Sequence, residues 1–259
     1  MDPRHSQIRL FIDHDLAEQM TVPLDAAHAH YLHTVMRKSV GTQIAVFNGR
    51  DGCFLAEVTE LSRKSGVITC LSLQTAQWFS PDLWLLFAPV KKARLDFMAQ
   101  KATELGASVI WPVKTAYTQV KHLKDERLRA NAIEAAEQTE RLDIPHVRDY
   151  SPLAEILKDW PADRALIFCD ERLAGDQTTD SLRILSEIGG HKAAILVGPE
   201  GGFSMSEKEM IDALPHSYGI SLGPRILRAD TAALSALSLY QAVKGDWLAT
   251  LSPPHNEVE

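Results

Sequence analysis

The 259-residue sequence holds few cysteines and no long apolar run. Its three cysteines, Cys53, Cys70 and Cys169, form no CxxC pair, so neither a disulfide framework nor a cysteine zinc site is supported. We expect them to be small, buried residues in strands. No stretch approaches the ~18 uninterrupted apolar residues of a membrane span. Residues 1–15 lack the apolar core of a signal peptide, so we expect a cytoplasmic protein with no membrane partner.

Several motifs of common enzyme classes are also missing. No Gly-Lys-Ser/Thr follows a glycine-rich loop, and there is no GxGxxG fingerprint and no GxSxG elbow. These absences argue against phosphate-cradling nucleotide hydrolysis and against serine hydrolase chemistry. His28, His30 and His33 cluster in one short segment, but they lack the full ligand set of a metal shell. We therefore expect surface histidines and no metal.

Charge is distributed unevenly along the chain, whose formal net charge is −7. Residues 1–75 hold 7 Lys and Arg against 8 Asp and Glu, and residues 91–148 hold 11 against 8. Residues 149–259 hold 9 against 17. If RNA is bound, the first 150 residues are therefore expected to bind it, although charge alone favours the interpretation as a solvated surface.

The first 75 residues have the pattern of a small β domain. Segments 43–48 and 53–61 flank the glycine-bounded turn Gly49 to Gly52, which predicts a hairpin, and 66–73 predicts a further strand. An apolar run at 8–12 comes first. Between it and the hairpin, one helix is expected to pack on the sheet or barrel through residues at helical spacing, namely Ala29, Leu32, Val35 and Met36.

From residue 76 onward the rhythm changes to strands alternating with helices. Buried strands are expected at 83–90, 108–113, 165–169 and 193–197, with a short one at 219–222. Helices are expected at 94–105, 125–138, 181–188, from 205, and at 229–247. This alternation predicts an α/β domain with a parallel sheet, residues 76–259, after a β domain at 1–75.

The segment LVGPEGGFSMSEKEM, 196–210, carries the strongest local signal. It leaves a buried strand, passes through a glycine-rich turn and enters a helix, whose start Ser204 and Glu207 fix as a capping box. Ligands of open α/β sheets bind at the carboxyl ends of strands, where glycines allow close backbone approach. A nucleoside-type ligand is therefore plausible, although a purely structural turn fits the same residues.

A second strand exit, by which we mean a glycine-containing turn directly after a strand, lies in ISLGPRILRADTAAL, 220–234. With both exits on adjacent strands, Arg225 and Arg228 would place positive charge at the lip of one pocket. Asp230 could equally cap the following helix. Two further segments are basic: Lys91, Lys92 and Arg94 at a strand end, and 134–145, where Arg141 fits either RNA contact or helix capping.

Taken together, these segments resemble the ribosomal small subunit methyltransferase E (RsmE) family of the SPOUT superfamily. The resemblance rests on H-x-x-x-x-V-M-R at 30–37, KATELG at 101–106, EAAEQTERLDIP at 134–145, GPEGGFS at 198–204 and LGPRILRADTA at 222–232, all in the family's order. It implies a PUA-like β-barrel that holds RNA, followed by a trefoil-knotted α/β domain, and a homodimer. It also implies transfer of a methyl group to N3 of one uridine near the 3′ end of 16S rRNA in the 30S subunit.

By this resemblance, S-adenosylmethionine is the methyl donor and no metal is needed. The matching cofactor positions are Cys169, Val197, Gly198, Glu200, Gly201, Leu222, Gly223, Ile226 and Leu227. The expected RNA contacts are Arg9, Arg37, Lys91, Lys92, Arg94 and Arg141.

Uracil N3 becomes nucleophilic as its proton leaves, so a cation or a nearby base would help. Arg228 is the candidate cation and Asp230 the weaker candidate base. The family usually carries Glu where this chain has Asp230, which shortens the reach by one methylene. Two alternatives stay open: a SPOUT methyltransferase of another rRNA or tRNA site, and a non-catalytic RNA-binding assembly protein.

Overall fold

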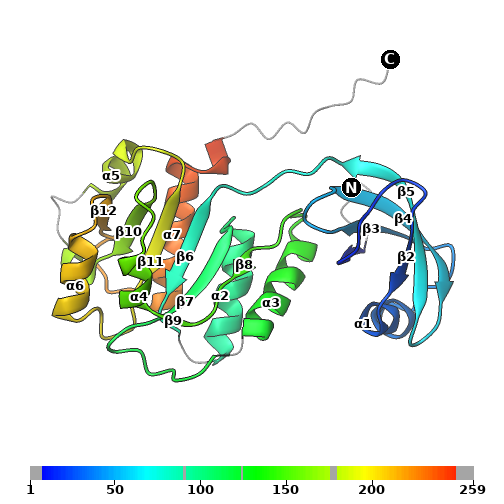
Figure 1. Ribbon diagram of the computed structural model, residues 1–259, viewed down its shortest axis with the longest axis horizontal. Coiled ribbons are helices and arrows are strands. Elements are labelled where there is room, and N and C mark those ends of the chain that lie inside the picture. The colour runs from blue at the N-terminus through cyan, green and yellow to red at the C-terminus, as the bar shows by residue number, and fades with distance from the viewer. Residues whose placement is uncertain (1–7, 90–91, 124, 176–179, 249–259) are drawn as a thin grey trace, which may run out of the picture. The chain divides into compact units, whose positions relative to one another are not determined.

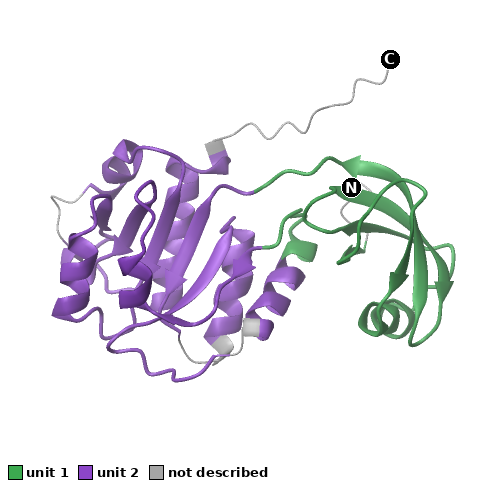
Figure 2. Ribbon diagram, viewed as in Figure 1, with its two compact units in different colours: residues 1–79, 136–144, 252–259 green, residues 80–135, 145–251 purple. Residues whose placement is uncertain are grey.

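The computed structural model describes residues 8–89, 92–123, 125–175 and 180–248. The chain divides into two compact units, coloured separately in Figure 2. Of the described residues, the first comprises 8–79 and 136–144, and the second comprises those within 80–135 and 145–248. The first unit therefore also contains residues 136–144, from the middle of the chain. A single domain boundary after residue 75 leaves this segment out of the first unit.

The first unit is a five-stranded mixed sheet with one short helix (Figure 1). Its strand order is β1-β3-β4-β5-β2, and only the β1–β3 pair is parallel. The expected hairpin and the strand after it are confirmed, and β2 is an additional strand. The elements are β1 (Arg9–Phe11), β2 (Thr21–Leu24), α1 (Ala26–His30), a π-helical turn (Tyr31–Val35), β3 (Gln43–Phe47), β4 (Cys53–Leu61) and β5 (Gly66–Thr75).

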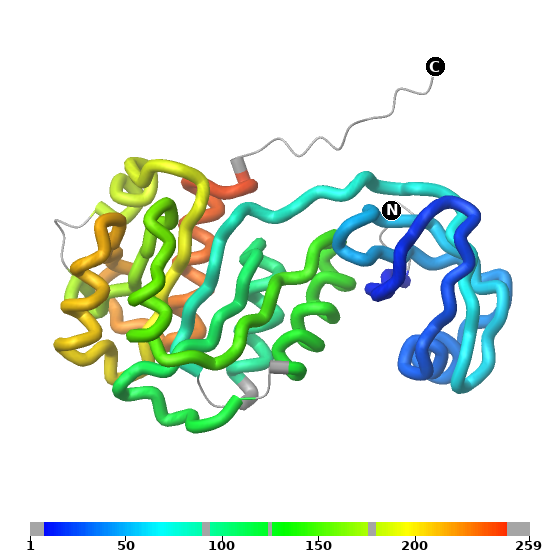
Figure 3. The backbone as a smooth tube through the Cα atoms, viewed as in Figure 1, coloured from blue at the N-terminus to red at the C-terminus, as the bar shows by residue number. Residues whose placement is uncertain are grey.

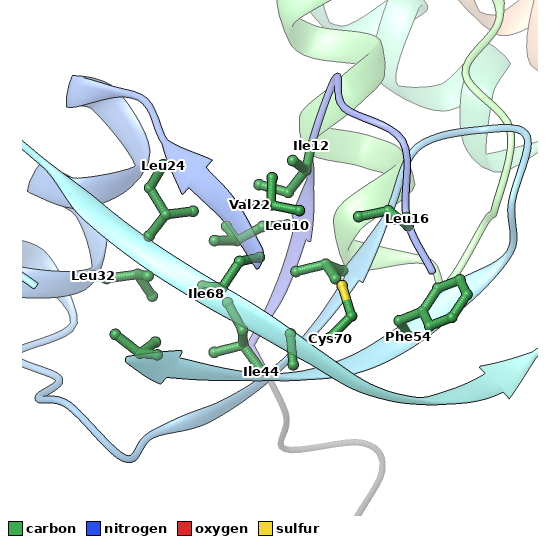
Figure 4. Packing of buried hydrophobic residues seen from close by; sticks show 13 residues of the cluster. Leu10, Ile12, Leu16, Val22, Leu24, Leu32, Ile44, Phe54, Ile68 and Cys70 are labelled. Carbon is green, nitrogen blue, oxygen red and sulfur yellow. The ribbon is translucent and has the colours of Figure 1, made fainter. Parts of the chain in front are cut away.

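Side chains from all five strands and from the helical segment meet in one core (Figure 4). Leu32 is fully buried there together with Ile44 and Ile68. The helix expected over this segment is confirmed, but two of its four predicted core residues are wrong: Val35 and Met36 are 59% and 36% exposed. The reason is that α1 widens into a π-helical turn, which rotates the later side chains off the packed face.

The second unit is an α/β layer structure, as the alternation of strands and helices in the sequence predicts. Short strands β8 and β9 and helix α4 are additions to the expected pattern. The elements are β6 (Leu83–Phe87), α2 (Lys92–Glu104), β7 (Val109–Lys114), α3 (Asp125–Gln138), β8 (His146–Val147), β9 (Ser151–Pro152), α4 (Leu153–Lys158), β10 (Ala165–Cys169), α5 (Ser181–Glu187), β11 (Ala193–Val197), α6 (Met205–Asp212), β12 (Ser217–Ile220) and α7 (Ala229–Val243), with 3-10 turns at Glu171–Leu173 and Asp246–Leu248.

Its sheet has the order β12-β10-β11-β6-β7-β8, with every neighbouring pair parallel. Helices α4 and α6 cover one face, and α2, α5 and α7 cover the other (Figure 1). Every residue of β11 is buried, as its unbroken apolar sequence predicts for a strand covered on both faces.

The strands that precede the two glycine-rich exits are not adjacent, so that expectation is wrong. Strand β10 lies between β11 and β12, and its residues pair with both neighbours. The path from β10 to β11, β12 and α7 can be followed in Figure 3. Sequence order did not reveal this arrangement, because the sheet inserts an earlier strand between two later ones.

Candidate active site

Three neighbouring strands end at the same edge of the second unit's sheet. Phe168 of β10 pairs with Leu196 of β11, and Cys169 pairs with Ile220 of β12, so the loops after these strands start side by side. Because parallel strands present their carboxyl ends together, this edge is where α/β proteins bind ligands.

The loop after β11 is a tight turn closed onto a helix. The Gly202 N–H donates to the Pro199 carbonyl at 2.9 Å, and Gly202 has φ +67°, which a non-glycine residue adopts only with strain. The predicted capping box is confirmed: Ser204 accepts from the Glu207 N–H, and the Glu207 carboxylate accepts from the Ser204 N–H at 2.8 Å. These bonds fix where α6 begins and hold the loop rigid.

The loop after β12 is fixed by hydrogen bonds to its neighbours. The Ser221 N–H donates to Ser181 Oγ at 2.9 Å, and Ser221 Oγ donates to the Leu173 carbonyl at 2.8 Å. Gly223 has φ +97° and donates its N–H to Ser221 Oγ. This loop is therefore attached to the start of α5 and to the loop after β10.

The loop after β10 brings two ionisable groups to the same edge. Burial raises the pKa of Asp170, but hydrogen bonds from the Arg172 side chain and backbone more than offset this, so the pKa is lowered overall. Burial raises the pKa of the Cys169 thiol to about 12. At neutral pH the edge therefore carries an Asp170 carboxylate and a neutral Cys169 thiol.

The three loops enclose a cavity of about 230 Å³, which we call the strand-end pocket. A single water needs only ~10–15 Å³ of such space, so the pocket has room for an organic ligand. Eight of the nine positions expected to bind cofactor line it: Cys169, Val197, Gly198, Glu200, Leu222, Gly223, Ile226 and Leu227. Gly201 is not among the lining residues and lies instead against Tyr117.

The pocket combines apolar walls with charges of both signs. Acidic groups come from Asp170, Glu171 and Glu200, and basic groups come from Lys208, Arg225 and Arg228. Sequence reasoning missed Asp170, Glu171, Phe203 and Lys208 as lining residues. Asp170 was detectable, because it directly follows a buried strand, as residues at the carboxyl edge of a sheet do.

The two candidate catalytic residues have different surroundings. Arg228 is the N-cap residue of α7, is exposed and lines the pocket. Asp230 lies in the first turn of α7 and is not a lining residue. It does not cap the helix, since the N-cap is Arg228. Its carboxylate lies 3.6 Å from Arg94 Nε and accepts the Thr231 N–H at 2.9 Å.

Two of the arginines expected to contact RNA have structural roles in the first unit. Arg141 is 4% exposed, and its guanidinium makes paired hydrogen bonds of 2.9 Å to Asp143. The Arg9 guanidinium lies over the Phe47 ring at 5.0 Å and donates to the Arg141 carbonyl at 3.2 Å. A buried, paired Arg141 cannot offer its charge to phosphates, which corrects that expectation.

The remaining basic candidates are distributed over both units. Arg37 is exposed, lies two residues beyond the π-helical turn and has φ +51°. Arg94 is 37% exposed and pairs with Glu200 and Asp230. Lys91 lies outside the described residues, as does the side chain of Lys92, the first residue of α2.

Comparison with known proteins places both units in known domain families. Residues 79–241 match the model of an RNA methyltransferase domain, and residues 24–69 match an RNA methyltransferase PUA domain. A relative from Rickettsia conorii, named ribosomal RNA small subunit methyltransferase E, is 32% identical over 89% of this chain and 93% of its own. One of the same name from Bacillus subtilis is 30% identical over 89% and 94%.

A crystal structure of the enzyme of that name from Neisseria gonorrhoeae, bound to S-adenosyl methionine, is also similar. It is 27% identical, covers 93% of this chain and 99% of its own, and superposes with a TM-score of 0.82. Fold and domain matches therefore define an RNA methyltransferase with an N-terminal PUA domain. More narrowly, the chain belongs to the ribosomal RNA small subunit methyltransferase E family.

Among the residues that the structure describes, no group of three or more His, Cys, Asp or Glu side chains is placed to hold a metal ion. None of the described helices combines the length and apolar character that crossing a membrane requires.

Proposed function

We propose that this protein transfers a methyl group from S-adenosylmethionine to N3 of a uridine near the 3′ end of 16S rRNA in the small ribosomal subunit. The observation that carries the proposal is the convergence of three strand-end loops on one pocket, whose lining contains eight positions matched to the family's cofactor site.

The residues of the pocket fit this cofactor chemically. Apolar side chains including Val197, Leu222 and Leu227 offer a surface for an adenine ring. Acidic side chains of Asp170, Glu171 and Glu200 complement the positive sulfonium and amino groups, and lysine and arginine side chains complement the carboxylate. When bound, the cofactor would supply an already activated methyl group, so the protein chiefly has to orient the nucleophile and control charge.

Arg228 is proposed to supply that charge control. As the N3–H bond of uracil breaks, negative charge spreads to the two carbonyl oxygens that flank N3, and a guanidinium at the pocket wall would stabilise it. The proton leaves N3 as the new N–C bond forms, and Asp230 remains the weaker candidate to accept it. In this structure Asp230 pairs with Arg94, so it would have to turn toward the base to do so.

The first unit is proposed to hold RNA, within the expected 1–75 domain. The segment from the last residue of α1 onward presents exposed His30, His33, Arg37 and Lys38 side chains, which suit contact with a phosphate backbone. Assembled 30S subunits are the proposed substrate, which places the enzyme in the cytoplasm.

The family's trefoil knot is proposed for the second unit. Strand β12 lies beyond β10 at the sheet edge, yet the helix that follows it, α7, returns to pack against β11 and β6. The knot is proposed from the family resemblance, and this return path agrees with it.

A homodimer is proposed through the free face of α7. Leu182 and Trp247 are 53% and 57% exposed, and both line a groove with Leu234, Leu239 and Ala242 of α7. A surface of this apolar character in a folded domain is typical of a subunit interface. The expected occupant is the same face of a second copy, as in most twofold dimers.

The proposed function can be tested with a strain that lacks this gene. Modified uridines are mapped in its ribosomal RNA, and its purified 30S subunits are offered to the protein with S-adenosylmethionine. Naked 16S rRNA and transfer RNA serve as comparison substrates. Loss of one N3-methyluridine near the 3′ end in the strain, restored on 30S subunits, is the expected result. Methylation of transfer RNA, or of another ribosomal site, would contradict the substrate assignment, and the absence of calorimetric cofactor binding would contradict the methyl donor.

A further inference from the structure

The loop after β7 places an aromatic side chain against the glycine-rich loop after β11, next to residues that line the strand-end pocket. Residues 115–118 form a compact turn, in which the Thr118 N–H donates to the Thr115 carbonyl and the Thr115 N–H donates to Thr118 Oγ at 3.0 Å. Tyr117 lies inside this turn and is 54% exposed. Because its backbone is held while its ring faces solvent, this tyrosine is a rigid exposed aromatic surface.

Glu207 joins this turn to the glycine-rich loop after β11. It is only 7% exposed, and one carboxylate oxygen accepts the Ala116 N–H at 2.7 Å. The other oxygen accepts the N–H and the hydroxyl of Ser204 at 2.8 and 2.9 Å. A buried carboxylate with three donors is costly to disturb, so Glu207 holds two loops in fixed register.

Gly201 is the point where these two loops touch. A Cβ atom built on Gly201 would lie 3.3 Å from Tyr117 Cβ and 3.5 Å from both Cγ and Cδ2 of the ring. Gly201 itself lies between Glu200 and Gly202, which both line the pocket. The missing side chain of Gly201 thus lets the tyrosine lie directly against the pocket's own loop.

We infer that the Tyr117 ring is the stacking surface for the RNA base that faces the cofactor at the mouth of the strand-end pocket, and that Glu207 is the positioning residue that holds this ring against the loop after β11. Enzymes that modify a base take it out of the helical stack and hold it against aromatic or apolar side chains. Aromatic side chains serve this purpose for any base, because each base has a π-face. The inference rests on the proposed function and names the group that receives its substrate.

The test compares Tyr117→Ala, Tyr117→Leu and Tyr117→Phe in the full-length protein. Single-turnover methyl transfer to 30S subunits lacking the modification is measured, together with calorimetric affinity for S-adenosylmethionine. Loss of one stacked base should lower kcat/KM by about 5- to 150-fold in Tyr117→Ala. Tyr117→Leu keeps apolar volume without a π-face and should be similarly impaired. Tyr117→Phe keeps the ring and should stay within about threefold of wild type.

Phe97→Ala is the matched control, because Phe97 is another aromatic residue of this unit, 41% exposed, but belongs to helix α2 and not to the loop after β7. Its activity and the cofactor affinity of all variants should match wild type. An active wild type with an equally active Tyr117→Ala would overturn the inference; should that variant unfold, Tyr117→Leu gives the same decision. A wild type that transfers no methyl group to any RNA would instead refute the proposed function.

The positioning role of Glu207 is tested with a measurement whose result a purely structural role would not explain. In the wild-type background, Glu207→Gln should lower kcat/KM for 30S subunits, because an amide cannot accept all three hydrogen bonds. In the Tyr117→Ala background the same change should have little further effect on kcat/KM, since the group it positions is gone. Additive losses in this double-mutant cycle would remove Glu207 from the positioning role.

Discussion

Arg94 Nε lies 3.6 Å from a carboxylate oxygen of Asp230. Nη1 of the same arginine lies 3.7 Å from Glu200, so one side chain of α2 reaches both the start of α7 and the glycine-rich loop. Arg94 is a sequence-based candidate for RNA contact, and Asp230 a candidate base. Their pairing means that neither can act in catalysis or RNA binding without affecting the other.

The Arg94–Asp230 pair is expected to be a weak but measurable coupling. Partly exposed ion pairs contribute roughly 0.2–1 kcal/mol, because water and lost side-chain entropy offset the Coulomb attraction. A double-mutant cycle with Arg94→Ala and Asp230→Asn, followed by urea unfolding, should give a coupling free energy in that range. Strict additivity would show that the pair is absent in solution.

Arg228→Ala should separate cofactor binding from methyl transfer. Removing one group that stabilises developing negative charge typically costs about 10²–10³ in kcat. Calorimetric affinity for S-adenosylmethionine is expected to stay within a few-fold of wild type, while single-turnover transfer falls by that factor. Arg225→Ala, at the other exposed arginine of the same pocket, is the comparison variant. If Arg228→Ala retains activity within a few-fold, the cationic role is disproved.

Gly202→Ala should destabilise the loop after β11. The left-handed backbone costs an alanine about 1–2 kcal/mol, and its Cβ would press against the Glu171 carboxylate, which would have to move. The free energy of unfolding should fall by about that amount, and cofactor affinity should fall with it. Gly189 has no atom within 4 Å of a built Cβ and lacks positive φ, so Gly189→Ala serves as control. Equal stability of the two variants would show that Gly202 is not restrained.

The raised pKa of the Cys169 thiol should slow its reaction with alkylating agents, because only the thiolate reacts. A thiol with a pKa of about 12 is far below half ionised between pH 7 and 10, so its alkylation rate should rise about tenfold per pH unit without levelling. In urea the alkylation rate of the same cysteine should level off near pH 9, where an ordinary thiol ionises. Peptide mass spectrometry with iodoacetamide resolves this site from Cys53 and Cys70. A plateau below pH 9 in the folded protein would contradict the pKa shift.

Leu182→Asp should dissociate the proposed homodimer. An unpaired carboxylate in an apolar interface costs several kcal/mol, so the dimer dissociation constant should rise at least about tenfold. Met205→Asp changes a residue that is 70% exposed on α6, at the opposite face of the sheet, and is the control for added charge. Sedimentation velocity should show monomers for the first variant and dimers for the second. Identical profiles would place the interface elsewhere.

The sequence predicted most strands and helices of both units because apolar residues recur at strand or helix spacing, or form an unbroken run, along each element. Strand β11 and helix α3 were expected within the bounds that the structure shows. Val35 and Met36 were misjudged because helical spacing assumes a regular helix, whereas this segment widens into a π-helical turn. The two-residue strand β8 and the two-residue strand β9 carry too little pattern to be detected.

The sequence alone determined the glycine-rich exits, the capping box at Ser204 and the family motifs, because each depends on residues close together in the chain. Only the tertiary structure decided that β10 separates β11 from β12, that Arg141 is buried and that Glu207 holds Tyr117 against Gly201. These relationships join residues distant in sequence, and their energies depend on burial and hydrogen-bond geometry that a linear pattern does not contain.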